Sequence, residues 1–297
     1  MAAAAKGEMG SWVSDAAREK FTAAYERVLA LWPQPVEALD LETTAATTRV
    51  NAYRPRRNGA PVVLLTGAGG SSPHWQPNVA ALSAAGPVYA IDFPGDPGAS
   101  VPRTLMTPPE TCAGWLDEVL AQLGGQPAHL VGASFGGWVA MNQALRSPGR
   151  VASIALLDPA GLTPLDARFW WWLSVSGMAS LSPRPVRRRL ARWLDNPAML
   201  DQEMMDLMWA GIRSYRMERK FPALLTDDQL ATITVPALMV TGARSALITP
   251  AQARDRASHL PNAQVAIVPG SHGGFSRLND LNAQVVAFLQ SVGAAAA

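Results

Sequence analysis

The sequence has almost no cysteine, since Cys112 is the only one among 297 residues. A single cysteine excludes an intramolecular disulfide and a zinc site made of thiolates. An excess of charge of one sign is also lacking, because 25 Lys and Arg residues face 23 Asp and Glu residues, for a formal net charge of +2. Such a balance favours neither a nucleic acid nor a membrane as a partner. We expect no metal and no cofactor.

Long hydrophobic runs are missing as well. No segment reaches the roughly 18 consecutive apolar residues of a transmembrane helix. Residues 1–10 are alanine-rich and then polar, without the basic stretch and apolar run of a signal peptide. We therefore expect a cytoplasmic location. Hydrophobic residues make up 48% of the chain, enough for a large core, and the length suits one large domain with a modest insertion.

Short apolar runs recur along the chain and alternate with segments of helical spacing. The runs cover residues 61–66, 88–92, 129–132, 151–158, 237–241 and 265–269. Runs that are apolar at every position are typical of strands buried on both faces of a sheet. Strand and helix in alternation predict an α/β fold with a doubly wound, mostly parallel sheet.

The alternation also predicts how the chain is divided. It assigns the core to residues 1–160 and 231–297, with a helix over 11–32 packed on it. The intervening residues 161–230 are rich in Trp, Met and Arg and contain no strand-like run. We predict that they form a helical cap over one end of the sheet.

A nucleophile motif lies in the middle of the core. Gly132-Ala133-Ser134-Phe135-Gly136 matches G-x-S-x-G and stands between an apolar strand and a helix. Such a turn is so tight that a side chain two residues before or after the serine would clash, and it lifts the serine hydroxyl off the backbone. We predict Ser134 as the nucleophile. The plainer alternative is a structural Gly-Ser turn.

A glycine-rich loop follows an earlier apolar strand, with the sequence Gly67-Ala68-Gly69-Gly70. In enzymes with such a serine turn, this loop donates one backbone N–H to a substrate oxyanion, and the residue after the nucleophile donates the other. The predicted donors are Ala68 and Phe135. A turn without a ligand is the alternative, whereas a phosphate-binding loop would need a Lys-Ser/Thr ending that is absent.

Only four histidines are available as a general base. His272 follows the last apolar strand, so it falls at the carboxyl edge of the sheet beside the nucleophile, and it comes last in chain order. We predict His272 as the base, against the alternative of a surface loop histidine. His74 and its neighbour Trp75 belong to the glycine-rich loop and are predicted to line the substrate pocket.

These motifs together resemble the α/β-hydrolase superfamily of esterases, lactonases and carbon–carbon bond hydrolases. The resemblance covers about residues 60–160 and 231–292. It implies a catalytic acid a few residues after the strand at 237–241, where this chain has Ser245. No carboxylate occurs between Asp228 and Asp255. The chain departs from the superfamily's usual pattern at this position.

Asp158 is the alternative acid, because some members of the superfamily carry the acid at the end of the preceding strand. An acid holds the imidazole in the required tautomer and stabilises the imidazolium that forms. We predict that Asp158 has this role and that Ser245 is a possible polar substitute. The competing interpretation is that Asp158 only caps a turn before Pro159.

The cap contributes the rest of the predicted site. Trp170 and Trp171 are expected to line an apolar pocket, although packing of cap helices accounts for most such residues. The cap also carries a run of arginines, at positions 184, 187, 188, 189 and 192. The simplest interpretation is a solvated helix face, and the alternative is a site for an acidic partner such as a carrier protein.

The function predicted from these residues is hydrolysis of an ester, thioester or lactone of a hydrophobic small molecule through an acyl-enzyme. The missing acid at position 245 leaves open a second class, a lyase, cyclase or acyltransferase of the same fold. A ligand-binding protein that has lost catalysis is a third possibility, and the intact serine motif and His272 argue against it.

Overall fold

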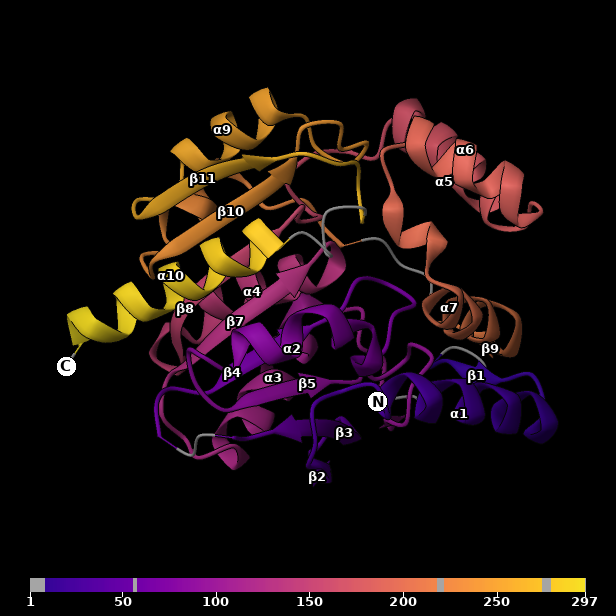
Figure 1. The fold of residues 1–297 in the computed structure, drawn as a ribbon. Coiled ribbons are helices and arrows are strands. Elements are labelled where there is room, and N and C mark those ends of the chain that lie inside the picture. The colour runs from indigo at the N-terminus through magenta and orange to yellow at the C-terminus, as the bar shows by residue number, and fades with distance from the viewer. Residues whose placement is uncertain (1–8, 56–57, 218–221, 274–278, 297) are drawn as a thin grey trace.

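The computed structural model describes residues 9–55, 58–217, 222–273 and 279–296. Its centre is a nine-stranded sheet with the order β11-β10-β8-β7-β4-β5-β3-β2, and β6 (Val101–Pro102) pairs with β3 (Figure 1). The other strands are β2 (Val36–Glu42), β3 (Ala46–Tyr53), β4 (Val62–Leu65), β5 (Val88–Ile91), β7 (Ala128–Ala133), β8 (Val151–Leu157), β10 (Ala237–Gly242) and β11 (Ala263–Val268). From β5 to β11 all neighbours are parallel, which confirms the predicted doubly wound α/β fold.

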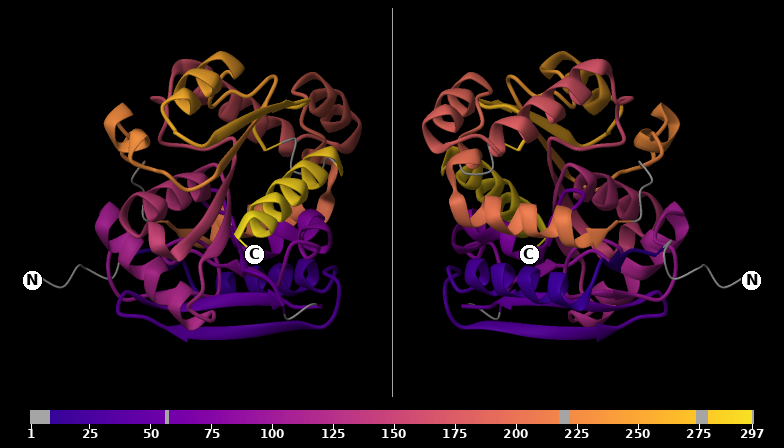
Figure 2. Two further views of the ribbon diagram at one scale, coloured as in Figure 1. Left: turned by 90° about the vertical axis from the view of Figure 1, so that its left-hand side faces the viewer. Right: turned by 90° about the vertical axis from the view of Figure 1, so that its right-hand side faces the viewer.

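Helices cover both faces of this sheet (Figure 2). Alternate residues of β4 show the two sides, since Val62 and Leu64 belong to one buried cluster and Val63 and Leu65 to the other. The first cluster contains α2 (Gln76–Leu82) and α10 (Asn279–Ala296); the second contains α3 (Pro109–Gln122), α4 (Phe135–Arg146), α8 (Asp227–Ala231) and α9 (Pro250–Ser258). Burial on both faces explains why these strands are apolar at every position.

The segment between β8 and α8 consists mainly of helices over the carboxyl ends of the strands (Figure 1). It contains α5 (Ala167–Ser180), α6 (Arg184–Trp193), the 3-10 turn η3 (Pro197–Leu200), α7 (Gln202–Ser214) and a two-residue strand, β9 (Tyr215–Arg216). A strand of two residues leaves no periodicity in a sequence, so β9 was not predicted for this segment. No helix within the described ranges is long and apolar enough to cross a membrane.

The N-terminal segment contacts the helical segment between β8 and α8, which we call the cap, as well as the core. Residues 11–12 form a strand, β1 (Ser11–Trp12), paired antiparallel with β9, so the predicted helix begins later. The helix is α1 (Asp15–Leu29), and its Ser14 cap accepts a hydrogen bond from the Ala17 N–H. Phe21, Ala24 and Val28 of α1 pack against Met204 and Leu207 of α7. The helix therefore lies between cap and core.

Candidate active site

Ser134 stands at the junction of β7 and α4. Its backbone has φ 50° and ψ −113°, a strained conformation for a residue with a side chain. Two hydrogen bonds to neighbouring backbone hold it, since the Ser134 N–H donates to the Leu157 carbonyl (2.9 Å) and the Ala160 N–H donates to the Ser134 carbonyl (2.9 Å). The serine is therefore fixed by the adjacent strand β8.

The two glycines of the motif are required by the crowded backbone around the turn. A Cβ atom at Gly132 would lie 2.2 Å from the Gly136 carbonyl oxygen. A Cβ atom at Gly136 would lie 2.0 Å from the carbonyl oxygen of Leu65, at the end of β4. Both distances are far below van der Waals contact, so only glycine fits, for the reason that the sequence predicted.

The glycine-rich loop lies directly against Ser134. Its Gly70 N–H donates to the Gly67 carbonyl (2.9 Å) and Gly69 has φ 75°, which together define a type II turn with Ala68 at the second position. A Cβ atom at Gly67 would lie 3.3 Å from the Ser134 Cβ. The two predicted oxyanion donors thus come from elements that touch at Ser134.

Two carboxylates after β5 hold this loop, a role that sequence reasoning did not find. Asp96 Oδ2 accepts a hydrogen bond from the Gly69 N–H (2.9 Å). The fully buried Asp92 accepts from the Ser72 N–H (2.7 Å) and from the Tyr25 hydroxyl of α1 (3.0 Å). Burial raises the pKa of Asp92, opposed by these hydrogen bonds.

His272 and Asp158 are in direct contact. His272 Nδ1 lies 2.5 Å from Asp158 Oδ2, and the Asp158 side chain is fully buried. Asp158 directly follows β8, and its N–H donates to the Val240 carbonyl of β10 (2.7 Å). Because β10 separates β8 from β11, the loop after β11 brings His272 across to this carboxylate.

Ser245 is hydrogen-bonded to the acid. Its hydroxyl donates to Asp158 Oδ2 (2.6 Å), the oxygen that also faces His272. The Ser245 oxygen accepts from the N–H groups of Leu247 (3.1 Å) and Ile248 (3.3 Å), so its own proton is directed to the carboxylate. Of the two candidates for contact with the imidazole, the structure places Asp158 there and puts Ser245 behind it.

The cap reaches His272 through residues that the sequence reasoning missed. The rings of Phe169 and Trp172 on α5 stand edge-on to the imidazole, with centroid distances of 6.1 and 5.4 Å. Of the two predicted pocket residues, Trp170 is 43% exposed. Trp171 is 54% exposed and lines a hollow of about 160 Å³ together with Trp172, Ser245 and Ser271. Residues three positions apart share a helix face. The spacing of Phe169 and Trp172 could therefore have identified them as a pair, once the direction of α5 is known.

Trp75 is a core residue, which corrects its predicted place in the pocket, whereas the pocket role of His74 stays a prediction. Both belong to the 3-10 turn η1 (Ser72–Trp75), where His74 Nδ1 accepts from the Ser71 N–H (3.1 Å). Burial lowers the pKa of His74. Trp75 is 4% exposed and packs in the core cluster with α2 and α10. The 3-10 turn therefore directs the Trp75 ring into the core.

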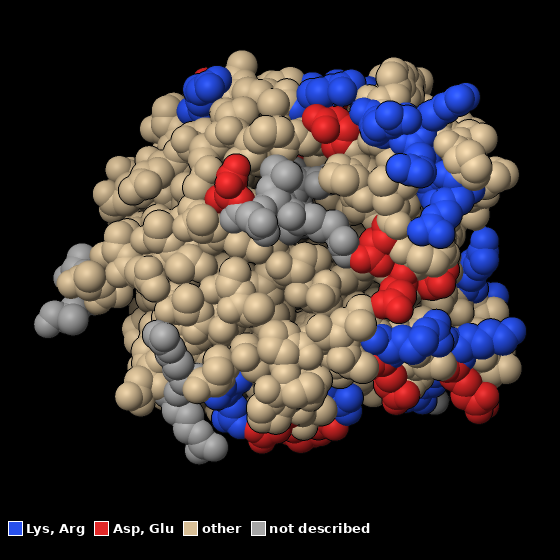
Figure 3. Space-filling view, in the orientation of Figure 1, with Lys and Arg blue, Asp and Glu red and all other residues tan. Residues whose placement is uncertain are grey.

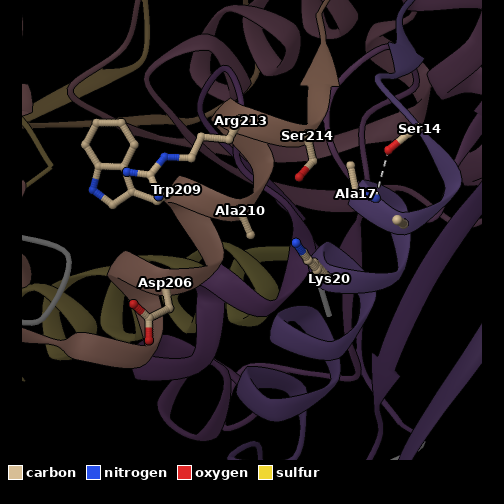
Figure 4. A pocket seen from close by; sticks show the side chains of 9 residues that line it. Ser14, Ala17, Lys20, Asp206, Trp209, Ala210, Arg213 and Ser214 are labelled. Atoms are coloured by element: carbon tan, nitrogen blue, oxygen red, sulfur yellow. Dashed lines mark hydrogen bonds between the residues drawn. The ribbon is translucent and has the colours of Figure 1, made fainter.

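A separate groove lies between α1 and α7 (Figure 4). It has a volume of about 480 Å³ and is lined by residues that include Lys20, Asp206, Trp209 and Arg213. None of the residues around Ser134 takes part in it. Among the described residues, no three His, Cys, Asp or Glu side chains gather closely enough to hold a metal ion.

The chain as a whole is similar to known proteins. The model of the alpha/beta hydrolase family matches residues 62–287. The chain therefore belongs to the alpha/beta hydrolase family. Within it, the chain falls among the carboxylic ester hydrolases, as its similarity to named proteins shows.

Two of the similar sequences and one similar solved structure come from Bacillus subtilis. The uncharacterized carboxylesterase nap is 30% identical over 259 residues, which are 84% of this chain and 84% of nap. The carboxylesterase YbfK is 32% identical over 259 residues, which are 84% of this chain and 86% of YbfK. The crystal structure of naproxen esterase superposes with a TM-score of 0.82 at 28% identity and covers 93% of this chain and 99% of its own.

Proposed function

We propose that this chain hydrolyses carboxylic esters of hydrophobic small molecules through an acyl-enzyme formed on Ser134. The observation that carries the proposal is the contact of His272 with the buried Asp158, at the same sheet edge as the strained Ser134. The carboxylesterase names of the similar proteins support the ester as the bond that is cleaved.

In the proposed reaction, Ser134 Oγ attacks the ester carbonyl while His272 takes its proton. Because Nδ1 of His272 faces Asp158, Nε2 is the ring nitrogen that takes the proton from Ser134. The same proton passes to the leaving alcohol, and the acyl group stays on Ser134. A water molecule, deprotonated by His272, then attacks the acyl carbonyl, releases the acid and restores the serine. Asp158 orients the ring and stabilises the imidazolium.

Charge develops on the carbonyl oxygen in both tetrahedral intermediates. We assign the N–H groups of Ala68 and Phe135 as its donors, because they belong to the two elements that meet at Ser134. Fixed backbone dipoles stabilise the oxyanion without reorganising. The hydrogen bond from the Gly69 N–H to Asp96 supports this role, since it fixes the peptide that follows Ala68.

The preference for a hydrophobic substrate rests on the aromatic residues around the site. Phe169 and Trp172 stand beside His272 from the cap. On the core side, Phe135 contacts Phe93 with a centroid distance of 5.0 Å and stacks on Trp138 at 5.6 Å. Aromatic walls favour apolar acyl or alcohol groups.

The non-hydrolytic alternative depended on the missing acid at position 245. The contact between Asp158 and His272 supports an intact acid–base pair and thus favours hydrolysis over a lyase, cyclase or acyltransferase.

Labelling with a fluorophosphonate probe tests the proposal. We expect one adduct on the peptide that contains Ser134, and none in Ser134→Ala with the circular dichroism of the unchanged protein. Hydrolysis of an aryl ester in ¹⁸O-labelled water should place one label in the acid product. A folded chain that gains neither the adduct nor the label would refute the mechanism.

A further inference from the structure

The helix pair α5 and α6 exposes much apolar surface. Seven of the thirteen large apolar side chains that are exposed among the described residues lie between positions 170 and 193. In α5 only Ala179 and Ser180 are buried, although most of the helix is apolar. A helix that is apolar on all sides is normally covered. The outer side of this pair therefore has the composition of a contact surface.

Positive charge accompanies this apolar surface. Arg184, Arg188, Arg189 and Arg192 of α6 are exposed and form no ion pair with any described residue. Neither α5 nor α6 contains an acidic residue. Figure 3 shows basic side chains gathered at this end of the molecule, over the helices that Figure 1 labels α5 and α6.

The two helices meet at an aromatic contact. Trp171 of α5 and Trp193 of α6 are in edge contact at 5.6 Å between ring centroids. Beside them lies a hollow of about 160 Å³, which Arg168 and Arg244 also line. We call this area the cap surface; it comprises Trp171, Leu173, Met178, Leu181, Val186, Trp193 and the four exposed arginines.

We propose that the cap surface binds the surface of an anionic phospholipid membrane. Helices that lie in a membrane interface combine tryptophan, arginine and exposed aliphatic residues. Their apolar side chains enter the acyl chains, and their cations lie at the lipid phosphates.

Other occupants fit this surface less well. A second copy related by a two-fold axis would bring the arginines of both copies together, with repulsion between like charges. An acidic protein would pair with the arginines but would leave Leu173, Met178 and Leu181 in water. A lipid surface satisfies both kinds of residue.

The location of the cap surface gives lipid binding a consequence for the proposed function. The same helix α5 carries Phe169 and Trp172, which contact His272 on its inner side. On the proposed function, a docked cap holds the site beside the membrane, where hydrophobic esters accumulate. Lipid binding itself does not depend on catalysis, so Ser134→Ala should bind vesicles as the unchanged protein does.

Vesicle flotation of the full-length protein tests the proposal. We expect flotation with phosphatidylcholine vesicles that contain 30% phosphatidylglycerol, release in high salt, and little flotation with phosphatidylcholine alone. Removing the four arginines as R184Q/R188Q/R189Q/R192Q should weaken partitioning by about fivefold per arginine. The control R18Q/K20Q/R27Q/R213Q changes the net charge equally on the α1 and α7 side and should float normally.

A second variant tests the apolar part. L173S/M178S/L181S should reduce flotation with the same vesicles and keep normal turnover of a water-soluble short-chain ester, which shows that it folds. Absence of flotation with the anionic vesicles would overturn the proposal, as would equal losses in the arginine variant and its control. Binding to poly-glutamate but not to the vesicles would overturn it in favour of an acidic protein partner.

Discussion

The carboxyl edge of the sheet and the cap above it hold their side chains in different ways. At the edge, Asp158 is fully buried and hydrogen-bonded, and Ser134 is fixed by the backbone of β8. In the cap, α5 buries two of its fourteen residues. Groups with little burial belong to the regions of low local stability. The sheet therefore fixes the reacting groups, while the less restrained cap provides the walls that meet the substrate.

The largest expected effect concerns Asp158, at the carboxyl edge of the sheet. Asp158→Asn keeps the volume but removes the charge and reverses the hydrogen bonding to His272, so kcat should fall by about 10⁴-fold. The measurement is steady-state hydrolysis of an aryl ester. Asp255→Asn, on the exposed side of α9, is the matched control. Activity of the Asp158 variant within tenfold of normal would exclude the carboxylate from catalysis.

A matched pair of glycines compares the two regions directly. Gly136→Ala inserts a Cβ against the Leu65 carbonyl and should destabilise the protein by at least about 1–3 kcal/mol. Gly177→Ala in α5 meets nothing within 4 Å and should stabilise by about 0.5–1 kcal/mol, because glycine is unfavourable inside a helix. Urea unfolding gives both values. Similar changes in the free energy of unfolding at the two positions would contradict the inference that the sheet edge is packed more tightly than α5.

Ser245→Ala tests the support of the acid. The change removes one of two hydrogen bonds to Asp158 Oδ2, so kcat should fall about tenfold with KM unchanged. Ser258→Ala, an exposed serine on α9, serves as the control for loss of a hydroxyl. If KM rises instead, Ser245 affects the substrate pocket and not the acid.

Trp172→Ala tests the inner face of the cap and should have the smallest effect. Loss of the ring beside His272 should raise KM for an apolar ester about fivefold, with little change in kcat. Trp170→Ala, two positions earlier and turned outward, should leave KM within about twofold. Equal changes in KM from both substitutions would show that the substrate does not contact one face of α5 in preference to the other.

Features of the structure that depend on residues close together in the chain could be predicted from the sequence, and features that depend on tertiary packing could not. The Ser134 turn is predictable because the clashes that require Gly132 and Gly136 arise within a few residues. The order of strands and helices is predictable because burial on both faces leaves apolar runs. Phe169 and Trp172 were missed because the direction of α5 is set by packing with α6 and α7, which no local pattern records. The relation of Ser245 to Asp158 required the strand order, since β8 and β10 are neighbours only in the folded sheet.

The N-terminal segment connects the cap to the core. One end of it is joined to the cap, by the pairing of β1 with β9 and the packing of α1 on α7. Its other attachment is Tyr25, whose hydroxyl bonds to Asp92 below the glycine-rich loop. The segment therefore ties α7 of the cap to the buried carboxylate below the loop beside Ser134.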